Sequence, residues 1–163
     1  MSNLMIRNAT MNDLEKIVSI EETCFPPAEA AKEPAIKERL NAYSKGFFIC
    51  EMDNEIVGFV NGAATDDSEI EDAFFESMDL HKDDGKNLVI FGLDVHPDFQ
   101  RQGIARQLMN HFIDFAKSDG KERVVLTCKD HLIKYYESFG YENLGESNSS
   151  HGGAKWYDMV LKL

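Results

Sequence analysis

The sequence predicts an α/β (α+β) fold: a mixed, mostly antiparallel central sheet of about seven strands, flanked by about four helices. Two features carry this prediction. Short apolar segments joined by polar turns indicate antiparallel hairpins, and apolar segments separated by helical patterns indicate right-handed β-α-β crossovers. The expected element order is β-α-α-β-β-β-α-β-α-β-β. At 163 residues, the chain is expected to form a single domain over residues 1–163.

The beginning of the chain is predicted to form one strand and two helices. Residues 4–9 (LMIRNA) are expected to form the strand, and Thr10 is the expected N-cap of a helix over residues 11–23. A second helix is expected over residues 28–43. We expect it to be disturbed near Pro34, because proline removes a helical hydrogen bond.

A β-hairpin is predicted to follow these helices. Its strands are expected over residues 46–51 and 55–65, with a turn at residues 53–54. Gly58 and Gly62 lie inside the second strand, where glycine usually marks a bulge or the close approach of another backbone. We therefore expect an irregular strand at this point.

Residues 66–86 differ from the rest of the chain because they are rich in acidic residues and contain a small apolar patch. Two interpretations remain open: a mobile excursion between two strands, or a short helix that folds over the active site. Glu69, Glu71 and Asp72 could attract a cationic substrate, or they could belong to a solvated charged segment.

The second half of the chain alternates strands and helices. We expect strands over residues 88–95, 123–128, 141–146 and 154–162. One helix is expected to follow the loop of residues 100–105 and to continue to about residue 117, and another is expected over residues 130–140. Asp130 is the expected N-cap of the last helix, and Gly140 is expected to end it.

The strand, loop and helix over residues 88–117 form a predicted anion site. The first N–H groups of a helix have no intrahelical partner, and the helix dipole adds positive charge there. Gly103 and the small Ala105 allow a phosphate to approach the backbone. A pyrophosphate is therefore expected here, although the loop has no Walker A Lys-Ser/Thr pair and the chain has no G-x-G-x-x-G motif.

Composition narrows the function classes. With 29 acidic and 17 basic residues, the formal net charge is −12, which disfavours nucleic acid and anionic membranes as partners and agrees with a cationic small molecule. No apolar run approaches a membrane span, and the N-terminus lacks the layout of a signal peptide, so a cytoplasmic protein is expected. The three cysteines are expected to be reduced, and no metal site is expected.

Two motifs resemble those of the GNAT superfamily of N-acetyltransferases. Gln100-x-x-Gly103-x-Ala105, preceded by LDVHP, is similar to the acetyl-CoA loop of that superfamily. Residues 130–145 are similar to its helix that lies against the CoA arm, with Tyr136 at the position of the tyrosine that points at the thioester sulfur. Without the resemblance, Tyr136 can also be interpreted as an aromatic residue of the core whose hydroxyl has a hydrogen-bond partner. The predicted element order is also that of the GNAT fold.

The resemblance implies acetyl-CoA as co-substrate and assigns roles at the site. The backbone N–H near Leu93 would hold the thioester carbonyl, and Tyr136 would protonate the departing thiolate, so these two are the expected catalytic residues. The expected cofactor-binding residues are Leu93, Asp94, Val95, Gln100, Arg101, Gln102, Gly103, Ile104, Ala105, Arg106 and Tyr136. The expected substrate-binding residues are Phe25, Pro26, Phe91 and Thr127.

A narrower resemblance links residues 6–26 and 126–145 to the arylalkylamine (serotonin) N-acetyltransferases. The vertebrate enzymes of that branch carry two histidines, proposed as a proton relay, where this chain has Val89 and Phe91. The general base is therefore not identified from the sequence. His96 lies at the junction of strand and loop, where a structural role is expected.

No catalytic role is expected for Asp94 or for the remaining histidines. Asp94 alternates to the opposite face from Leu93 and Val95, so it could support the loop. The remaining histidines have no local constellation and are expected at the surface: His81, His111, His131 and His151.

The expected function is acetyl-CoA-dependent transfer of an acetyl group to a primary amine of a small molecule, of the arylalkylamine or polyamine type, by direct attack on the thioester. Two alternatives remain: a protein acetyltransferase acting on lysine or an N-terminus, and a non-catalytic acyl-CoA-binding regulatory domain. The acceptor amine is not identified, and either a monomer or a homodimer is expected.

Overall fold

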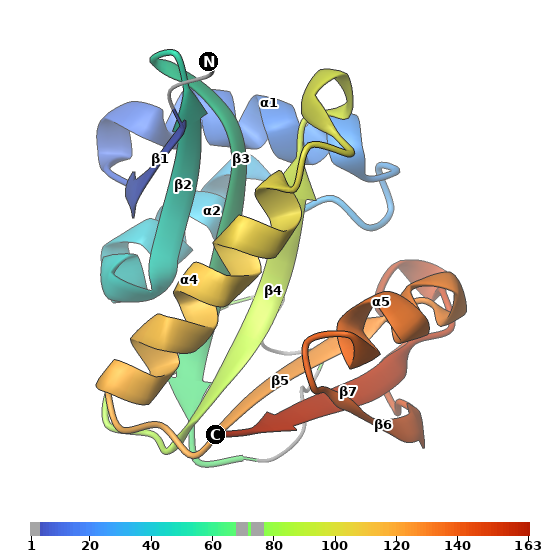
Figure 1. The fold of residues 1–163 in the computed structure, drawn as a ribbon. Helices are drawn as coiled ribbons and strands as arrows, with labels where there is room; N and C mark the ends of the chain where they lie inside the picture. The colour runs from blue at the N-terminus through green and yellow to red at the C-terminus, as the bar shows by residue number, and fades with distance from the viewer. Residues whose placement is uncertain (1–3, 68–71, 73–76) are drawn as a thin grey trace.

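The computed structural model describes residues 4–67, 72 and 77–163, and it contains a seven-stranded sheet in the order β1-β2-β3-β4-β5-β7-β6 (Figure 1). Only β4 and β5 pair in parallel; the other neighbours are antiparallel. The strands are β1 (Leu4–Asn8), β2 (Phe47–Met52), β3 (Glu55–Thr65), β4 (Asn87–Val95), β5 (Arg123–Cys128), β6 (Glu142–Glu146) and β7 (Tyr157–Lys162). The predicted mixed sheet is confirmed.

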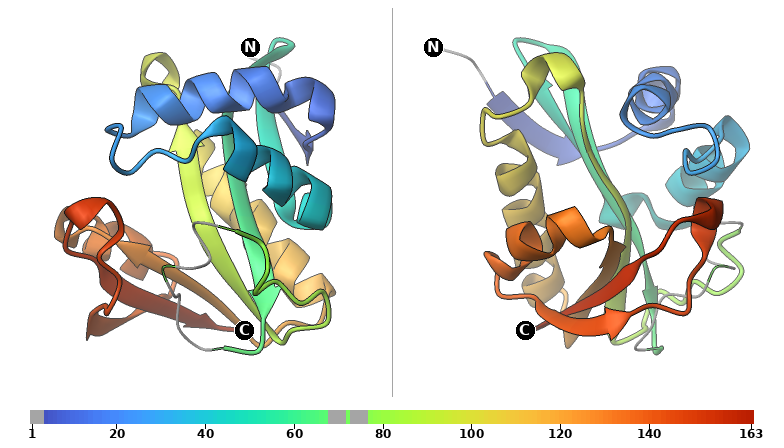
Figure 2. Two further views of the ribbon diagram at one scale, coloured as in Figure 1. Left: turned by 180° about the vertical axis from the view of Figure 1, so that it is seen from behind. Right: turned by 90° about the vertical axis from the view of Figure 1, so that its right-hand side faces the viewer.

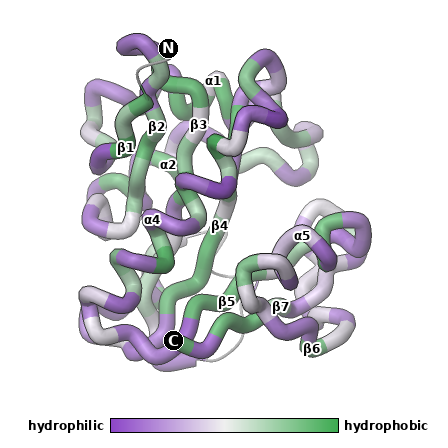
Figure 3. The backbone as a smooth tube through the Cα atoms, viewed as in Figure 1, coloured by the Kyte–Doolittle hydropathy of each residue, from purple (hydrophilic) through white to green (hydrophobic). Residues whose placement is uncertain are grey.

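Four α-helices lie in the described part of the chain: α1 (Leu14–Cys24), α2 (Glu33–Tyr43), α4 (Ile104–Ser118) and α5 (Ile133–Glu137). Figure 2 shows α1 and α2 on one face of the sheet and α4 on the other. The central strands are accordingly hydrophobic along most of their length, whereas α4 alternates between polar and apolar residues (Figure 3). None of the helices in the described residues is both long and apolar enough to cross a membrane.

The central strands are buried on both faces because their side chains alternate between two cores. Phe47 and Ile49 of β2 pack in the core beneath α1 and α2, whereas Phe48 and Cys50 pack in the core beneath α4. Phe112 of α4 is fully buried in the second core. The sheet is therefore held rigidly between the two helical layers.

The helix boundaries follow capping and proline rules, with two corrections. Thr10 precedes a 3₁₀ turn that leads into α1, and its backbone N–H donates to the Asp13 carboxylate (2.8 Å), as in a capping box. The expectation of a helix over residues 28–43 disturbed at Pro34 was wrong. The helix begins at Glu33, and Pro34 lies in its first turn, where a missing N–H costs nothing.

The start of α5 was also predicted too early, because the helix was expected to begin at residue 130 and begins at Ile133. Asp130, the expected N-cap, is instead the first residue of a 3₁₀ turn that precedes α5. The expected stop at Gly140 is also displaced: α5 ends at Glu137 with Ser138 as its C-cap, and Gly140, with a φ of 104°, lies in the turn that follows.

The two glycines of β3 confirm the predicted close approach. A Cβ on Gly58 would lie 2.6 Å from the Asp94 carbonyl oxygen, and a Cβ on Gly62 would lie 2.2 Å from the Val89 carbonyl oxygen. Asn61 pairs with Gly92 and Gly62 with Ile90, so Phe91 is an extra residue in β4. This β-bulge increases the local twist of β4.

Strands β4 and β5 separate soon after they begin to pair. Only Asn87, Leu88 and Val89 pair with β5, and they face Arg123–Val125. The rest of β5 pairs with β7 alone. The two ribbons diverge towards the carboxyl end of β4 in Figure 1, and this divergence places backbone groups of β4 next to a cavity.

The ends of the acidic segment are pinned to the body of the protein. The Lys82 ammonium contacts the Asp66 carboxylate (2.7 Å), and its backbone N–H donates to the Ala64 carbonyl (2.8 Å). The Asp72 carboxylate accepts from the Ser149 hydroxyl (2.5 Å). Glu69 and Glu71 lie outside the described residues, so the choice between an excursion and a helix there stays open.

Two histidines depart from the expected surface positions. The His81 side chain is buried; its Nδ1 accepts from the Ala64 N–H (3.0 Å), and its ring lies 4.5 Å from that of Tyr43. His111 is partly buried with its ring against Phe48 (4.6 Å). Because these contacts join residues far apart in the chain, no local pattern revealed them.

The close approach of β3 and β4 at Gly62 can be tested by adding one methyl group. Gly62→Ala should lower the free energy of unfolding by roughly 1–3 kcal/mol, because a backbone carbonyl has to move to make room. Urea denaturation measures this loss. Gly120→Ala is the control: nothing lies within 4 Å of its Cβ position, and only its φ of 74° opposes alanine. Wild-type stability of Gly62→Ala would contradict the steric argument.

Candidate functional site

A cavity of about 470 Å³ opens where β4 leaves β5. We call it the central cavity. Its walls come from the carboxyl halves of β4 and β5, from α1 and the segment after it, from α5, and from His151 and Trp156. The residues of the sequence prediction that line it are Phe25, Pro26, Phe91, Leu93, Asp94, Val95, Gln100, Thr127 and Tyr136.

The other predicted cofactor residues, Arg101 to Arg106, lie at the start of α4. Arg101 and Gly103 have left-handed backbone conformations, with φ of 64° and 80°, and Gly103 is the N-cap of α4. The first hydrogen bond in the helical register runs from the Gln107 N–H to the Gly103 carbonyl (3.1 Å), so the preceding N–H groups have no partner within the helix. Nothing lies within 4 Å of a Cβ position on Gly103. This open cradle of backbone donors suits a pyrophosphate.

The loop is tied to β4 through a single carbonyl. The Val95 carbonyl oxygen accepts from the Gln100 side-chain amide (3.1 Å) and from the Cys24 thiol (3.3 Å). Burial raises the pKa of Cys24 to about 12, so the thiol keeps its proton and remains a donor. His96 caps the turn before the loop, with its Nδ1 accepting from the Asp98 N–H (3.1 Å), in agreement with a structural role.

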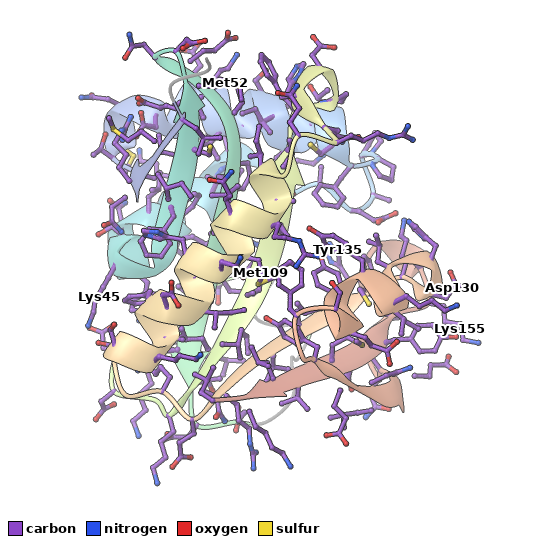
Figure 4. The ribbon with its side chains drawn as sticks, viewed as in Figure 1. Lys45, Met52, Met109, Asp130, Tyr135 and Lys155 are labelled. Carbon is purple, nitrogen blue, oxygen red and sulfur yellow. The ribbon has the colours of Figure 1, made fainter. Side chains whose placement is uncertain are left out.

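Arg106 connects α4 to α5. Its guanidinium donates to the Ser138 hydroxyl (2.9 Å) and lies over the Phe139 ring, 4.3 Å from the ring centroid. Tyr135 lies between the two helices (Figure 4), 5.8 Å from the same guanidinium. Arg106 therefore holds α5 beside the start of α4.

The Tyr136 ring packs against the hydrophobic core and against two neighbouring tyrosine rings. Its ring packs edge-on against Tyr135 (5.3 Å) and Tyr141 (6.0 Å). Burial raises the pKa of the Tyr136 hydroxyl above its ordinary value, so the group is protonated at neutral pH and can act as a donor. The position agrees with either interpretation of Tyr136, because the residue lines the central cavity and also packs in the core.

A buried polar cluster at the floor of the cavity escaped the sequence prediction. Glu21 of α1 and Arg39 of α2 are 7% and 6% exposed, and Asp94 of β4 is 1% exposed. Asp94 does not hydrogen-bond to the loop that it was expected to support; it faces the Glu21 carboxyl. Burial, followed by the Glu21 charge, raises the pKa of Asp94 well above its usual range.

The surroundings of the cluster fix its geometry. The Glu21 carboxylate accepts from the Ala31 N–H (2.8 Å), and the Arg39 guanidinium lies 4.2 Å from the centroid of the Phe91 ring. Burial lowers the pKa of Arg39 to about 10, against the opposing pull of Glu21 and Asp94, so the guanidinium is charged at neutral pH. One signal in the sequence could have pointed to Glu21: a carboxylate on the same helical stripe as the buried Ile17 and Ile20.

Residues 25–32 and residues 147–156 contact each other beside the cavity, and both segments contribute to its lining; we call this contact the outer wall. Lys129 forms an ion pair with the Glu29 carboxylate (2.9 Å), and His151 Nε2 lies 2.9 Å from the Glu29 carbonyl oxygen. A Cβ on Gly152 would lie 2.6 Å from the Glu29 side chain. The two segments also approach one another in the right-hand view of Figure 2.

The two remaining histidines, His131 and His151, differ in how exposed they are. His151, expected at the surface, is partly buried, and its carbonyl accepts from the Trp156 indole N–H (2.8 Å). His131 is exposed as expected, although it borders the cavity. Within the described ranges, no group of three or more His, Cys, Asp or Glu residues could hold a metal ion.

The chain is similar in sequence to curated proteins that are longer than it is. The chain is 25% identical over 168 residues to a probable hydrolase of Bacillus subtilis (strain 168), covering 98% of this chain and 32% of that protein. It is 27% identical over 112 residues to serotonin N-acetyltransferase of Mesocricetus auratus, covering 68% of this chain and 53% of that protein. The chain thus spans between a third and about half of the length of these curated relatives.

Solved structures share the fold at low identity. The loading GNATL domain of CurA from Lyngbya majuscula aligns with a TM-score of 0.85 at 16% identity, covering 98% of both chains. A putative acetyltransferase from Salmonella typhimurium, solved with its cofactor acetyl-CoA, aligns with a TM-score of 0.69 at 19% identity, covering 98% of this chain and 94% of that chain. The overall fold of this chain is therefore shared with these solved structures.

The family assignment rests on the sequence itself. Residues 14–141 match the family model described as acetyltransferase (GNAT) family, and this range runs from the start of α1 through α5. It includes both motifs that flank the central cavity. The chain therefore belongs to the acetyltransferase (GNAT) family.

Proposed function

We propose that this protein is an acetyl-CoA-dependent N-acetyltransferase that acetylates a primary amine of a small molecule, of the arylalkylamine or polyamine type. One observation carries the proposal: the central cavity follows the stretch of β4 that has no partner in β5, reaches Gln100 in the loop that leads to the bare start of α4, and has a floor of buried carboxyl groups. The first two features suit the cofactor, and the third suits an ammonium. The Salmonella protein, which was solved with its cofactor acetyl-CoA, supports acetyl-CoA as the co-substrate.

The cofactor would lie between β4 and β5, where it supplies the thioester that is cleaved. Backbone donors from Arg101 to Arg106 would hold the pyrophosphate. Leu93 and Val95 would bind the pantetheine arm along the edge of β4, in the manner of an added strand. The Leu93 N–H would donate to the thioester carbonyl oxygen, which places a fixed donor where negative charge develops. The Tyr136 hydroxyl would donate its proton to the departing sulfur.

The acceptor side of the cavity favours a small cationic molecule. Its lining combines the rings of Phe25, Phe91 and Trp156 with the carboxyl groups of Glu21 and Asp94. The cavity volume of about 470 Å³ is in the range of pockets that enclose small ligands. The name of the Mesocricetus relative, serotonin N-acetyltransferase, supports an arylalkylamine. Val89 and Phe91 cannot relay protons, so this site would need a different base.

The outer wall disfavours the alternative of a protein acetyltransferase. A peptide has to cross the site in an open groove, whereas the contacts of Glu29 with Lys129 and His151 close this side of the cavity. The donor position of Tyr136 disfavours a non-catalytic binding domain. Both alternatives are outcomes of the experiment below.

An acceptor panel tests the proposed function. Acetyl-CoA is supplied with arylalkylamines, polyamines, a lysine-containing peptide and a peptide with a free N-terminus, and release of the CoA thiol is followed together with the mass of the product. We expect turnover with at least one small amine and none with the peptides. Turnover with peptides alone would contradict the small-amine assignment. Acetyl-CoA binding without turnover on any acceptor would favour the regulatory alternative.

The pyrophosphate cradle can be tested without turnover. Acetyl-CoA at a hundredfold excess over its dissociation constant should stabilise the protein by roughly 2.7 kcal/mol, seen as a rise in Tm. Gly103→Glu should abolish the rise, because the new carboxylate would occupy the cradle and repel phosphate. Gly120→Glu is the matched control, since Gly120 lies just beyond the opposite end of α4 with a similar φ of 74° and equally open surroundings. A normal Tm rise in Gly103→Glu would place the phosphate site elsewhere.

The donor role of Tyr136 can be tested by removing one hydroxyl. Tyr136→Phe should keep the Tm rise with acetyl-CoA, while kcat falls by roughly 10²–10⁴-fold, the usual contribution of a general acid. Tyr135→Phe is the control, because the neighbouring ring has a similar packing environment but does not line the cavity. An unchanged kcat in Tyr136→Phe would assign the residue to packing alone.

A further inference from the structure

The buried carboxyl groups of Glu21 and Asp94 form a pair that requires a shared proton. Both carboxyl groups lie against Gly92, where Asp94 Oδ1 and Glu21 Oε1 are 3.0 Å and 3.8 Å from its Cβ position, and two ionised carboxylates could only accept hydrogen bonds. No donor in the described part of the chain reaches either oxygen of Asp94. The close approach of two carboxyl groups therefore requires a shared proton, and the raised pKa of Asp94 places that proton on Asp94. Burial of Asp94 agrees with this state, because it disfavours a second negative charge.

The charges around the pair are balanced only while that proton is present. Arg39 of α2 offsets one carboxylate, and the other ionisable neighbours, Cys24 of α1 and Tyr136 of α5, are neutral at physiological pH. Glu38 of α2 is a further negative charge on the side of Arg39, and Asn61 of β3 is the uncharged polar neighbour. Loss of the shared proton leaves one uncompensated negative charge at the floor of the cavity. A single cation could take its place.

The pair lies beside the backbone that would hold the thioester. A Cβ on Gly92 would lie 3.0 Å from Asp94 Oδ1 and 3.8 Å from Glu21 Oε1, so both carboxyl groups flank this residue. Gly92 immediately precedes Leu93, whose N–H is the proposed donor to the thioester carbonyl. Glu21, Gly92 and Leu93 all line the central cavity. An amine held by Glu21 would therefore lie next to the carbonyl that it attacks.

We propose that the Glu21–Asp94 pair is the binding site for the acceptor ammonium and the proton acceptor of the reaction. This inference rests on the proposed function and names the base that the sequence leaves open. Glu21, which faces the cavity, would be the catalytic residue. Asp94 would be a positioning residue that acts through Glu21.

The proton balance of the step is as follows. The incoming ammonium displaces the shared proton to solvent and then gives one of its own protons to the pair, which restores the acid–carboxylate contact. The neutral amine attacks the thioester carbonyl carbon, so that the C–N bond forms and the C–S bond breaks. The second amine proton reaches the sulfur through the Tyr136 hydroxyl. One proton is released for each acetyl group transferred.

Kinetics against pH test the inference, using the best small amine from the panel. Glu21→Gln keeps the shape of the side chain and an acceptor for the Ala31 N–H, but it cannot take a proton. We expect kcat/KM to fall by roughly 10²–10⁴-fold and the acid limb of the pH profile to disappear. Glu22→Gln is the matched control, because Glu22 is the adjacent residue of α1 and is exposed. Glu21→Asp should recover part of the activity together with the acid limb.

A substitution of Asp94 separates positioning from simple structural support. In Asp94→Asn the amide still donates to Glu21, but no second carboxyl competes for the proton. The acid limb should therefore move to lower pH, with a smaller loss of kcat than in Glu21→Gln. A purely structural role would lower activity without moving the limb. The rise in Tm with acetyl-CoA, measured for every variant, shows that each one is folded and binds the cofactor.

Two failures can be distinguished. If the wild-type protein acetylates no amine, the proposed function fails, and this inference fails with it. If the wild-type protein is active but Glu21→Gln matches Glu22→Gln in kcat/KM and in its acid limb, the acetyltransferase assignment stands and the carboxyl pair is not the base.

Discussion

The early separation of β4 from β5 is the constraint on which the whole site depends. Backbone N–H and C=O groups in the middle of a sheet normally find partners on both neighbouring strands, and an unpaired buried group is costly. Here the bulge at Phe91 increases the twist of β4, while the close approach at Gly58 and Gly62 keeps β4 against β3. β5 instead follows β7. The cost of leaving the edge of β4 unpaired is offset if a bound ligand supplies the missing hydrogen bonds.

The central cavity also contains ionisable side chains that are buried, which is unusual in a protein core. Charged groups are rarely buried, because transfer of an ion out of water costs several kcal/mol even after relaxation. Nevertheless Glu21, Arg39 and Asp94 meet beneath two helices. The left-handed Arg101 adds backbone strain of order 1–3 kcal/mol a few residues away. Such features survive where function requires them, and here three buried ionisable side chains line one cavity.

The sequence was a good guide where the signal is local. The hairpin turn at residues 53–54, the capping box at the 3₁₀ turn before α1 and the glycines of β3 each depend on residues close in the chain, and the structure confirms them. It was a poor guide where burial is set by distant residues. His81 is buried through contacts with Ala64 and Tyr43, and Glu21 gains its meaning from Asp94, which lies on a different element. A periodic pattern places Glu21 on the inner face of α1, but it does not show what that face meets.

The proposed cofactor site and the proposed acceptor site are formed by different parts of the chain. The proposed pyrophosphate cradle is a strand-loop-helix unit of consecutive residues, which explains why a short motif could reveal it. The outer wall joins residues 25–32 to residues 147–156, and Asp72 of the acidic segment accepts a hydrogen bond from Ser149 in the second of these. Segments that are remote in sequence would thus border the proposed acceptor space, and the acidic segment is tied to this wall through Ser149. Changes in these loops can alter which acceptor fits without disturbing the helix N-terminus that would hold the cofactor. For this reason a family motif identifies the cofactor more readily than the acceptor.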